Sequence, residues 1–255
     1  MVINIMNRIL ISRDKIDYDS LKVNVSGNVI KFLESGIYSV EYENIEKVDY
    51  CFLISDKRAV ILSECSFSGN LIVNNKYIVD NGNLIINKFY DNDSVLENVD
   101  IELYNNGKID YKFSNICKNN EDYTININHM GIGTESNINN KSVAVNGGKL
   151  NFVINSIVGK EYEKSILNQN TRIVTIGECD CKISPNMFID CDNIEARHGS
   201  VIGTFKDDML FYLMSRGINY NDSVKLLIKG YFFSNIDVNI ELRDKILSVI
   251  DKYWR

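Results

Sequence analysis

Short β-type runs, each followed by a turn signal, dominate the chain from about Ser20 to Phe205. Their β-branched and aromatic residues favour strands, and the Asn, Asp and Gly residues between them accept turn conformations at little cost. Helical periodicity is nearly absent, and the runs are too short and too evenly spaced for alternating strands and helices. The pattern predicts a mainly β body, which can be a sandwich, a barrel or a β-solenoid. Representative runs are Asn28–Phe32, Tyr50–Ile54, Ala59–Leu62, Leu71–Val73, Leu84–Ile86 and Thr124–Ile127, and representative turns are Asn81-Gly82-Asn83, Asn105-Asn106-Gly107 and Asn146-Gly147-Gly148.

The sequence changes character after Lys206, where helices are expected. Asp207 and Asp208 can cap a helix and complement its dipole. Gly217 can accept the left-handed conformation that ends a helix. The third segment is amphipathic, because its apolar residues recur at helical spacing. We therefore expect a small helical domain after the β body, with helices over Met209–Arg216, Asn221–Phe233 and Asn239–Tyr253, the last presenting Ile246, Val249, Ile250 and Tyr253 on one face.

The charge balance and the lack of long apolar stretches limit the class of protein. The net charge is -6 and the sequence pI is about 5.1, which argues against nucleic-acid binding through clustered Lys and Arg. The first residues, MVINIMNRILISRDK, lack the apolar stretch of a signal peptide, and no window approaches a membrane span. We expect a cytoplasmic protein, without a membrane segment, whose partners are proteins or small species.

The six cysteines are scattered and lack the density of a disulfide framework, so thiols are expected in a reducing cytoplasm. Cys51, Cys65 and Cys117 lie in apolar strand contexts and are interpreted as core residues. His129 has no motif around it and is interpreted as a structural, hydrogen-bonded histidine.

One block of the sequence resembles a known family. It reads Ala196-Arg197-His198-Gly199-Ser200-Val201-Ile202-Gly203 and continues as Asp207-Asp208-Met209-Leu210-Phe211-Tyr212-Leu213-Met214-Ser215-Arg216-Gly217-Ile218. This resembles the most characteristic block of the SufB/SufD family of iron-sulfur cluster assembly proteins, roughly A-x-H-G-A-x-x-G, an acidic spacer and L-F-Y-L-x-S-R-G-I. Upstream, Gln169, Asn170, Ile173–Ile176 and Pro185 are similar to the segment that precedes the family's histidine. The resemblance covers about residues 146–233.

The resemblance implies a right-handed parallel β-helix followed by a small α-helical domain. It suggests a short N-terminal region (1–45), a β-helix core (46–205) and a helical ATPase-docking domain (206–255). Members of this family pair through their last β-helix strands, as homodimers or SufB/SufD heterodimers, and dock onto the ATPase SufC. The implied function is a non-enzymatic scaffold for a transient iron-sulfur cluster, expected to be [4Fe-4S]. No nucleotide is expected on this chain, which lacks a G-x-x-x-x-G-K-[ST] loop.

The expected cluster site contains thiolates together with more labile imidazole or carboxylate ligands. His198 occupies the position of the family's histidine, and a structural histidine is the alternative. Cys179, Cys181 and Cys191 lie within 20 residues of His198 and are candidate cluster ligands. The alternative is that they are small buried apolar residues. A further alternative is a structural zinc site that they form together with His198. Glu195 is a candidate iron ligand or an exposed charge, and Arg197 is interpreted as an ion-pair residue. Asn170 stands where a SufB-type member carries cysteine, which points to a SufD-like or compact SufB-like protein.

The helical block suggests where a partner binds. Phe211, Tyr212, Arg216 and Gly217 belong to the domain that docks SufC in the family. Their alternative roles are packing of Phe211 and Tyr212 against the solenoid and helix termination by Gly217. A solenoid adaptor that binds SufC without a cluster is the competing function. A carbohydrate-active β-helix is disfavoured, since no secretion signal and no motif for a carboxylate pair are recognised.

Overall fold

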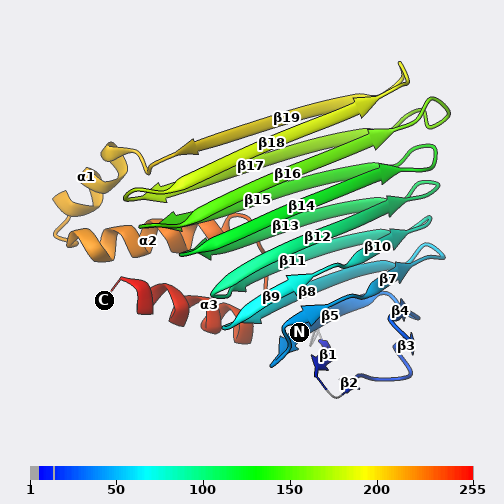
Figure 1. Ribbon diagram of the computed structural model, residues 1–255, viewed down its shortest axis with the longest axis horizontal. Helices are drawn as coiled ribbons and strands as arrows, with labels where there is room; N and C mark the ends of the chain where they lie inside the picture. Colours follow the sequence, from blue (N-terminus) through cyan, green and yellow to red (C-terminus); the bar gives the residue numbers. More distant parts are fainter. Residues whose placement is uncertain (1–5, 14, 255) are drawn as a thin grey trace.

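The computed structural model describes residues 6–13 and 15–254. These residues form a two-sheet parallel β-solenoid, which is followed in the chain by three helices (Figure 1). The parallel β-helix with a C-terminal helical domain is therefore confirmed. The strands are β1 (Asn7–Ser12), β2 (Ile16–Asp17), β3 (Val23–Ser26), β4 (Val29–Phe32), β5 (Gly36–Glu43), β6 (Lys47–Val48), β7 (Cys51–Ile54), β8 (Ala59–Phe67), β9 (Asn70–Val73), β10 (Lys76–Val79), β11 (Asn83–Asp91), β12 (Ser94–Leu103), β13 (Lys108–Cys117), β14 (Asn120–His129), β15 (Glu135–Val145), β16 (Lys149–Val158), β17 (Ile166–Ile176), β18 (Asp180–Ile189) and β19 (Glu195–Gly203).

Successive coils place one strand in each sheet. One sheet has the order β19-β17-β15-β13-β11-β8-β5-β1-β2, and the other has the order β18-β16-β14-β12-β10-β7-β4-β3 with β6 and β9 beside this path. Neighbouring coils stack in parallel register without a slip, as in β13, β15 and β17. Alternate side chains point between the two sheets and form the main core. Stacked rings such as Tyr123 on Phe152, with centroids 4.9 Å apart, fill it.

The Asn and Gly breaks form the corners of the solenoid. Asn81, Asn106 and Gly147 have φ values of 50°, 56° and 84°, in the left-handed region that these residue types tolerate. Gly107 is required for a second reason, because a Cβ there would lie 2.3 Å from the Val79 carbonyl oxygen. These corners confirm the predicted turns.

The N-terminal region proposed as residues 1–45 contributes to the same sheets wherever it is described. Strands β1 and β5 pair in parallel with each other and β5 pairs with β8, so the solenoid includes residues before 46. Strands β2 and β3 pair antiparallel with β1 and β4. This antiparallel pairing ends the parallel stack at the N-terminal side. Residues 1–5 lie outside the described residues.

The helices are α1 (Asp207–Ser215), α2 (Tyr220–Phe233) and α3 (Ile240–Tyr253), within a residue or two of their predicted bounds. Asn219 and Asn239 cap α2 and α3 by accepting from the amides of Asp222 and Leu242. Lys206 stands at the N-cap of α1, so the predicted capping by Asp207 or Asp208 is wrong. Both aspartates lie inside the first turn, where their charge still complements the helix dipole.

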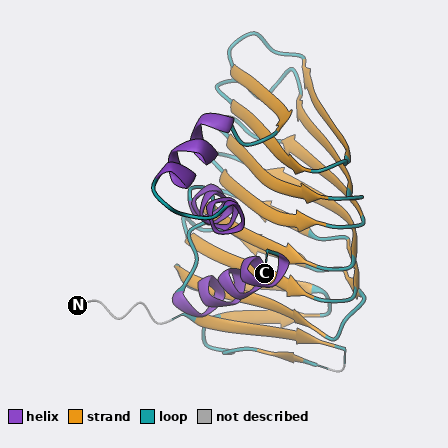
Figure 2. Ribbon diagram, turned by 90° about the vertical axis from the view of Figure 1, so that its left-hand side faces the viewer, coloured by secondary structure: helices purple, strands orange, loops and turns teal. Residues whose placement is uncertain are grey.

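Helices α2 and α3 cover the outer face of the nine-stranded sheet (Figure 2). Ile228 and Phe232 from α2 and Ile246 and Ile250 from α3 are buried there. The amphipathic face expected for α3 is thus the packed face. The strands beneath the two helices contribute to this second core, with Cys65, Phe89, Ile116, Val143 and Val174.

A charged cluster lies inside the solenoid. Lys88 Nζ lies 2.6 Å from Glu97 Oε1 and 3.2 Å from Glu64 Oε1, and all three side chains are fully buried. Tyr90 donates a hydrogen bond of 2.7 Å to Glu64. Burial lowers the pKa of Lys88, but the two carboxylates outweigh burial and raise it, so the lysine stays charged. Lys88 therefore compensates charges that would otherwise be buried without a partner.

Among the described helices, none combines the length and the apolarity needed to cross a membrane.

Candidate functional site

The C-terminal end of the solenoid is open. Strands β18 and β19 are the last strands of their sheets, and their residues are mostly exposed or half-buried, unlike those of the preceding coils. The amides of Asp180 and Asp190 donate to the Gly148 and Val158 carbonyls of the preceding coil. By alternation, odd-numbered residues of β18 direct their backbone polar groups at the open edge. Both sheets therefore end in a strand with unpaired backbone groups.

Pro185 lies in the middle of this edge. It is the only proline of the chain and belongs to the odd-numbered set of β18, so its missing N–H is on the open side. Proline is tolerated in a sheet at such a position because no ladder hydrogen bond is lost. Pro185 thus permits pairing with β16 while leaving a gap in the row of edge donors.

His198 lies on β19 and faces the inside of the last coil. It pairs in register with Gln169 of the preceding coil. Gln169 in turn lies over Ile138, and Ile138 lies over Tyr111, in the coils before that. Ile138 and Tyr111 are buried, whereas His198 is exposed because no further coil covers it. The family's histidine position is therefore at the open end.

The neighbours of His198 on β19 point to the outer face. Arg197 and Glu195 are exposed and lie 3.7 Å apart, so the interpretation of Arg197 as an ion-pair residue agrees with the geometry. Asn170, at the position of the SufB-type cysteine, is also exposed and stands in register with Gly199. An outward-facing side chain at this position points away from the inner face that carries His198.

The three candidate cysteines do not gather around His198 within one chain. Cys179 and Cys181 lie at the start of β18, and Cys191 follows its end; ten residues of strand separate Cys181 and Cys191 by about 30 Å. In the part of the chain that the structure describes, no three His, Cys, Asp or Glu side chains are placed to hold a metal ion. The alternative zinc site of these cysteines with His198 is therefore not formed by a single chain.

The environment of Cys181 and Cys191 favours their protonated form. Burial, helped by Cys179 and Asp180, raises the pKa of Cys181 to about 11. Burial and the nearby carboxylates of Glu163, Asp192 and Asp190 also raise the pKa of Cys191. A metal ion that binds either sulfur must displace its proton.

Most of the residues interpreted as structural are buried. Cys65 and Cys117 are buried in the two hydrophobic cores, as expected. Cys51 is only half-buried at the start of β7, so its interpretation as a core residue is wrong. All three are free thiols. His129 is buried, with Nδ1 2.7 Å from Thr134 Oγ1 and Nε2 2.9 Å from Ser136 Oγ. Burial lowers the pKa of His129 to about 4. Both of its nitrogens are engaged, which confirms a structural role.

Helix α1 exposes its apolar residues. Phe211 is 75% exposed and Tyr212 is 58% exposed, so the expectation that they pack against the solenoid is wrong. None of the residues of α1 is buried. Arg216 lies over the Tyr212 ring at 5.3 Å, and Gly217 has a φ of 87°, which confirms that it ends the helix.

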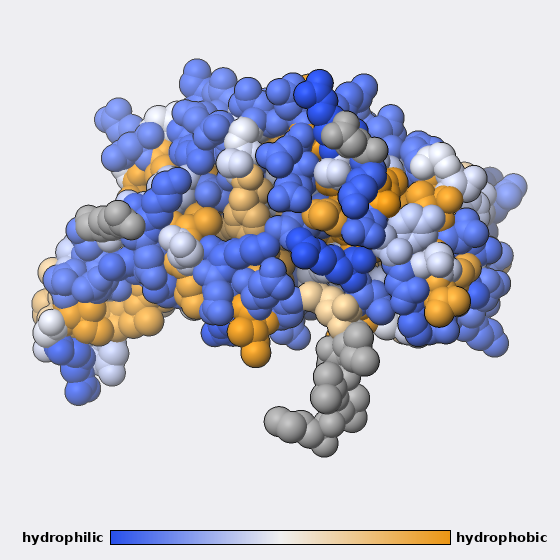
Figure 3. Space-filling view, turned by 90° about the horizontal axis from the view of Figure 1, so that it is seen from below, coloured by the Kyte–Doolittle hydropathy of each residue, from blue (hydrophilic) through white to orange (hydrophobic). Residues whose placement is uncertain are grey.

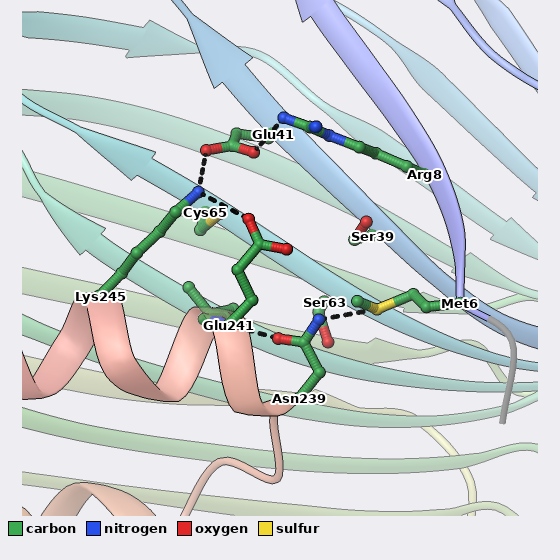
Figure 4. A pocket seen from close by; sticks show the side chains of 10 residues that line it. Met6, Arg8, Ser39, Glu41, Ser63, Cys65, Asn239, Glu241 and Lys245 are labelled. Atoms are coloured by element: carbon green, nitrogen blue, oxygen red, sulfur yellow. Dashed lines mark hydrogen bonds and ion pairs between the residues drawn. The ribbon is translucent and has the colours of Figure 1, made fainter. Parts of the chain in front are cut away.

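A pocket of about 260 Å³ between α3 and the outer face of β1, β5 and β8 escaped the sequence analysis (Figure 4). Glu41 lines the pocket and accepts hydrogen bonds from Lys245 at 2.6 Å and from Arg8 at 2.9 Å. Burial raises the pKa of Cys65 in its wall to about 12, which makes this thiol a poor nucleophile. The charges are mutually paired and hold α3 on the sheet. No local sequence signal could have found the pocket, since its residues are up to about 240 positions apart.

Comparison with known proteins agrees with the motif at the open end. Residues 105–231, about half of the chain, match the family model described as "SUF system FeS cluster assembly, SufBD core domain". The chain is similar to the iron-sulfur cluster assembly protein SufD of Escherichia coli (strain K12), 30% identical over 94 residues, or 37% of this chain and 21% of that protein. It is also similar to SufD of Bacillus subtilis (strain 168), 28% identical over 137 residues, or 52% of this chain and 31% of that protein.

A third relative is SufB of Bacillus subtilis (strain 168), 29% identical over 105 residues, or 40% of this chain and 22% of that protein. The matched segments span less than a third of the length of each of these relatives. The residues that match the family model include the strands of the last coils and the block around His198 and α1. The chain belongs to the SufB/SufD family of iron-sulfur cluster assembly proteins.

Proposed function

We propose that this chain is a scaffold subunit for the assembly and transfer of iron-sulfur clusters, working as a dimer with a SufC-type ATPase. The observation that carries the proposal is the open end of the solenoid, where His198 faces inward on an uncovered coil. The scaffold holds the nascent cluster, expected to be [4Fe-4S], as cargo. It acts without enzymatic chemistry or a bound nucleotide of its own.

The asymmetry of the solenoid supports pairing at the β18 and β19 end. The opposite end finishes in the antiparallel strands β2 and β3, which are only 2 and 4 residues long and so present short edges. The view of the molecule from that side is mostly hydrophilic (Figure 3). At the open end, a second solenoid supplies partners for unpaired backbone groups and covers apolar residues such as Ile202. The partner is a second copy or a SufB/SufD-type relative.

Pairing at this end also supplies ligands that one chain cannot gather. His198 from each copy approaches the junction, and Cys179, Cys181, Cys191 and Glu195 flank the same last coil. Thiolate and imidazole ligands from two subunits form a site that opens when the subunits move apart, as transfer of a cluster requires. The proposed ligands remain His198 with one or more of these cysteines, and Glu195 as an oxygen ligand.

Helix α1 is the proposed docking element for the ATPase. Exposed aromatic and Met side chains with an adjacent Arg are typical of interface anchors. Here they are Met209, Phe211, Tyr212, Met214 and Arg216, and Gly217 sets the direction in which the chain leaves the helix.

Anaerobic reconstitution with iron and sulfide tests the scaffold function. The protein, with and without a SufC-type ATPase, is expected to form a coloured dimer whose visible absorption is lost on exposure to oxygen. His198→Ala and the Cys179→Ser/Cys181→Ser and Cys191→Ser variants identify the ligands by loss of colour. Cys51→Ser is the matched control, because Cys51 is half-buried on β7, far from the open end. A colourless monomer under all conditions would contradict the proposal.

A solenoid adaptor that binds the ATPase without a cluster is the second candidate. The separation of Cys181 from Cys191 and the Asn at position 170 favour it. Retained ATPase binding by a protein that stays colourless would identify the adaptor, and cluster loss with retained ATPase binding in the ligand variants would identify the scaffold.

Substitution of the two exposed aromatic residues of α1 tests whether this helix binds the ATPase. Phe211→Ser/Tyr212→Ser is expected to weaken binding to a SufC-type ATPase by at least about tenfold, since removal of each interface anchor costs on the order of 1–2 kcal/mol. Tyr220→Ser, an exposed aromatic at the start of α2, is the control and should bind like the parent. Calorimetry measures the affinity. Equal affinity of all three proteins would exclude α1 as the docking site.

A further inference from the structure

We propose that Gln169 is a positioning residue for His198: its side-chain oxygen accepts a hydrogen bond from one ring N–H and leaves the other ring nitrogen free for a metal ion. The metal-binding part rests on the proposed function, whereas the hydrogen bond concerns the chain itself. The sequence analysis used Gln169 only as part of the family resemblance, without a role.

The orientation of the Gln169 amide follows from its contacts. Its Nε2 donates to Ser156 Oγ at 2.8 Å and to the Asn186 carbonyl oxygen at 3.1 Å. The reversed amide would place its oxygen against that carbonyl oxygen, which cannot donate. Oε1 is therefore the free end of the side chain.

This oxygen is buried without a partner. Gln169 is 3% exposed, and its Oε1 has no hydrogen bond within the described residues. A buried acceptor left unsatisfied destabilises the folded state, so a donor at this position stabilises the protein. The coil below offers none in register, because Gln169 stands over Ile138.

The coil above offers His198. The two residues are paired in register on β17 and β19, so their backbones are about 4.8 Å apart, and both side chains lie on the inner face. A rotation of the exposed imidazole brings one N–H to Oε1. The neutral ring then carries its lone pair on the other nitrogen, directed away from Gln169.

Histidine ligands in proteins characteristically donate their second ring N–H to a fixed acceptor, which sets the tautomer and the ring orientation. His129 provides a contrast inside the same molecule. Both of its nitrogens are occupied by Thr134 and Ser136, which leaves no position for a metal. His198 has one fixed acceptor beneath it and open space at the edge.

Nitrogen NMR of the metal-free protein tests the hydrogen bond directly. At about pH 8, where an ordinary imidazole is neutral, the ring nitrogen shifts of His198 should report one dominant tautomer. Gln169→Met keeps the side-chain length without the amide and should give the tautomer mixture of a free imidazole.

Thr171→Val is the matched control, because Thr171 is also buried on the inner face of β17 but accepts from Asn140. It should leave the tautomer unchanged. An unchanged tautomer in Gln169→Met, or an equal change in Thr171→Val, would overturn the proposal; amide spectra confirm that each variant is folded.

Iron(II) binding under anaerobic conditions separates this proposal from the proposed function. Gln169→Met should bind iron roughly 10–100-fold more weakly than the parent, as is typical for loss of such an outer hydrogen bond, and Thr171→Val should bind like the parent. A fixed tautomer in a parent protein that binds no iron would support the hydrogen bond and contradict the scaffold function. Equal iron affinity in Gln169→Met would overturn the positioning role.

Discussion

Glu121 and His129 are buried titratable residues of the solenoid interior, and they respond to pH in opposite directions. Burial raises the pKa of Glu121 to about 7, although hydrogen bonds from Tyr123 and Asn115 lower it in part. Burial lowers the pKa of His129 to about 4. The folded protein thus keeps a proton on Glu121, and leaves His129 neutral, at pH values where the unfolded chain does the reverse.

The pH dependence of Glu121→Gln follows from this difference. Between about pH 4.5 and 7 the folded state retains a proton on Glu121 that the unfolded chain has lost, so its contribution to the free energy of unfolding falls as pH rises, by about 3 kcal/mol. The glutamine variant lacks this fall. Its stability relative to the parent should therefore increase by about 3 kcal/mol from pH 4.5 to pH 8, as measured by urea unfolding.

The contribution of His129 to the free energy of unfolding rises with pH between about 4 and 6.5. It is the same in the parent and in Glu121→Gln, so it cancels when the two are compared. Glu178→Gln, an exposed turn substitution, serves as the control for the loss of one negative charge. A constant difference for Glu121→Gln would show that the buried carboxyl titrates as it does in the unfolded chain.

The helices differ in how firmly they are attached to the solenoid. Helix α3 is held by Lys245 on Glu41 at 2.6 Å and by Tyr253, which donates to Asp91 at 2.8 Å. Helix α2 contributes Tyr231, whose hydroxyl donates to the Arg172 carbonyl at 2.6 Å. Helix α1 has no buried residue. The element that presents the proposed docking surface is therefore the least constrained of the helices.

Substitution of two glycines in the helical domain by alanine should change the stability of the protein in opposite directions. Gly217 has a φ of 87°, whereas Gly230 lies inside α2, and an added Cβ meets nothing within 4 Å at either position. Gly217→Ala should destabilise the protein by about 1–2 kcal/mol because of the left-handed backbone. Gly230→Ala should stabilise it by roughly 0.5–1 kcal/mol through helix propensity. Thermal unfolding measures both, and a shift of the same sign in the two variants would contradict this assignment.

The molecule as a whole is a stack of coils with unequal ends. Each coil contacts chiefly its neighbours, so an end coil with one neighbour has fewer stabilising contacts than a central coil. The N-terminal end finishes in antiparallel strands. The C-terminal end finishes in β18 and β19 with free edges.

Hydrogen exchange should therefore alternate along the last strands. In the monomer, the edge-facing amides of Cys181, Ile183, Met187 and Ile189 should exchange fast, and the even-numbered amides of β18, bonded to β16, should exchange slowly. Association of two solenoids at this end should protect the first set and leave the second unchanged. Residue-resolved exchange by NMR at low and high protein concentration measures both. Uniform exchange along β18 in the monomer would contradict the register described here.

Much of this architecture was predictable from local patterns. Alternating β-branched residues with Asn and Gly corners predict strands and turns, because side-chain alternation and left-handed φ values are properties of a few adjacent residues. The spacing of Ile246, Val249, Ile250 and Tyr253 predicts the packed face of α3 for the same reason. The choice of a solenoid over a sandwich or barrel came from the family block around His198, because strand propensity does not specify which strands pair.

The candidate site was predictable only as a set of residues. His198, the cysteines and α1 can be identified from their order in the chain, but their separation depends on strand length and coil register. The exposure of Phe211 and Tyr212 could not be predicted either, because the sequence pattern of an apolar helix face is the same whether that face packs on the solenoid or binds a partner.

The strands, the corners, the helices and the family follow from the amino-acid sequence, since each depends on neighbouring residues or on a short block. The open end of the solenoid, the placement of Cys181 and Cys191 near opposite ends of β18, and the position of Gln169 beneath His198 become visible only in the folded molecule. Contacts between coils join residues about 27 to 31 positions apart, and their register is set by the stacking of whole coils.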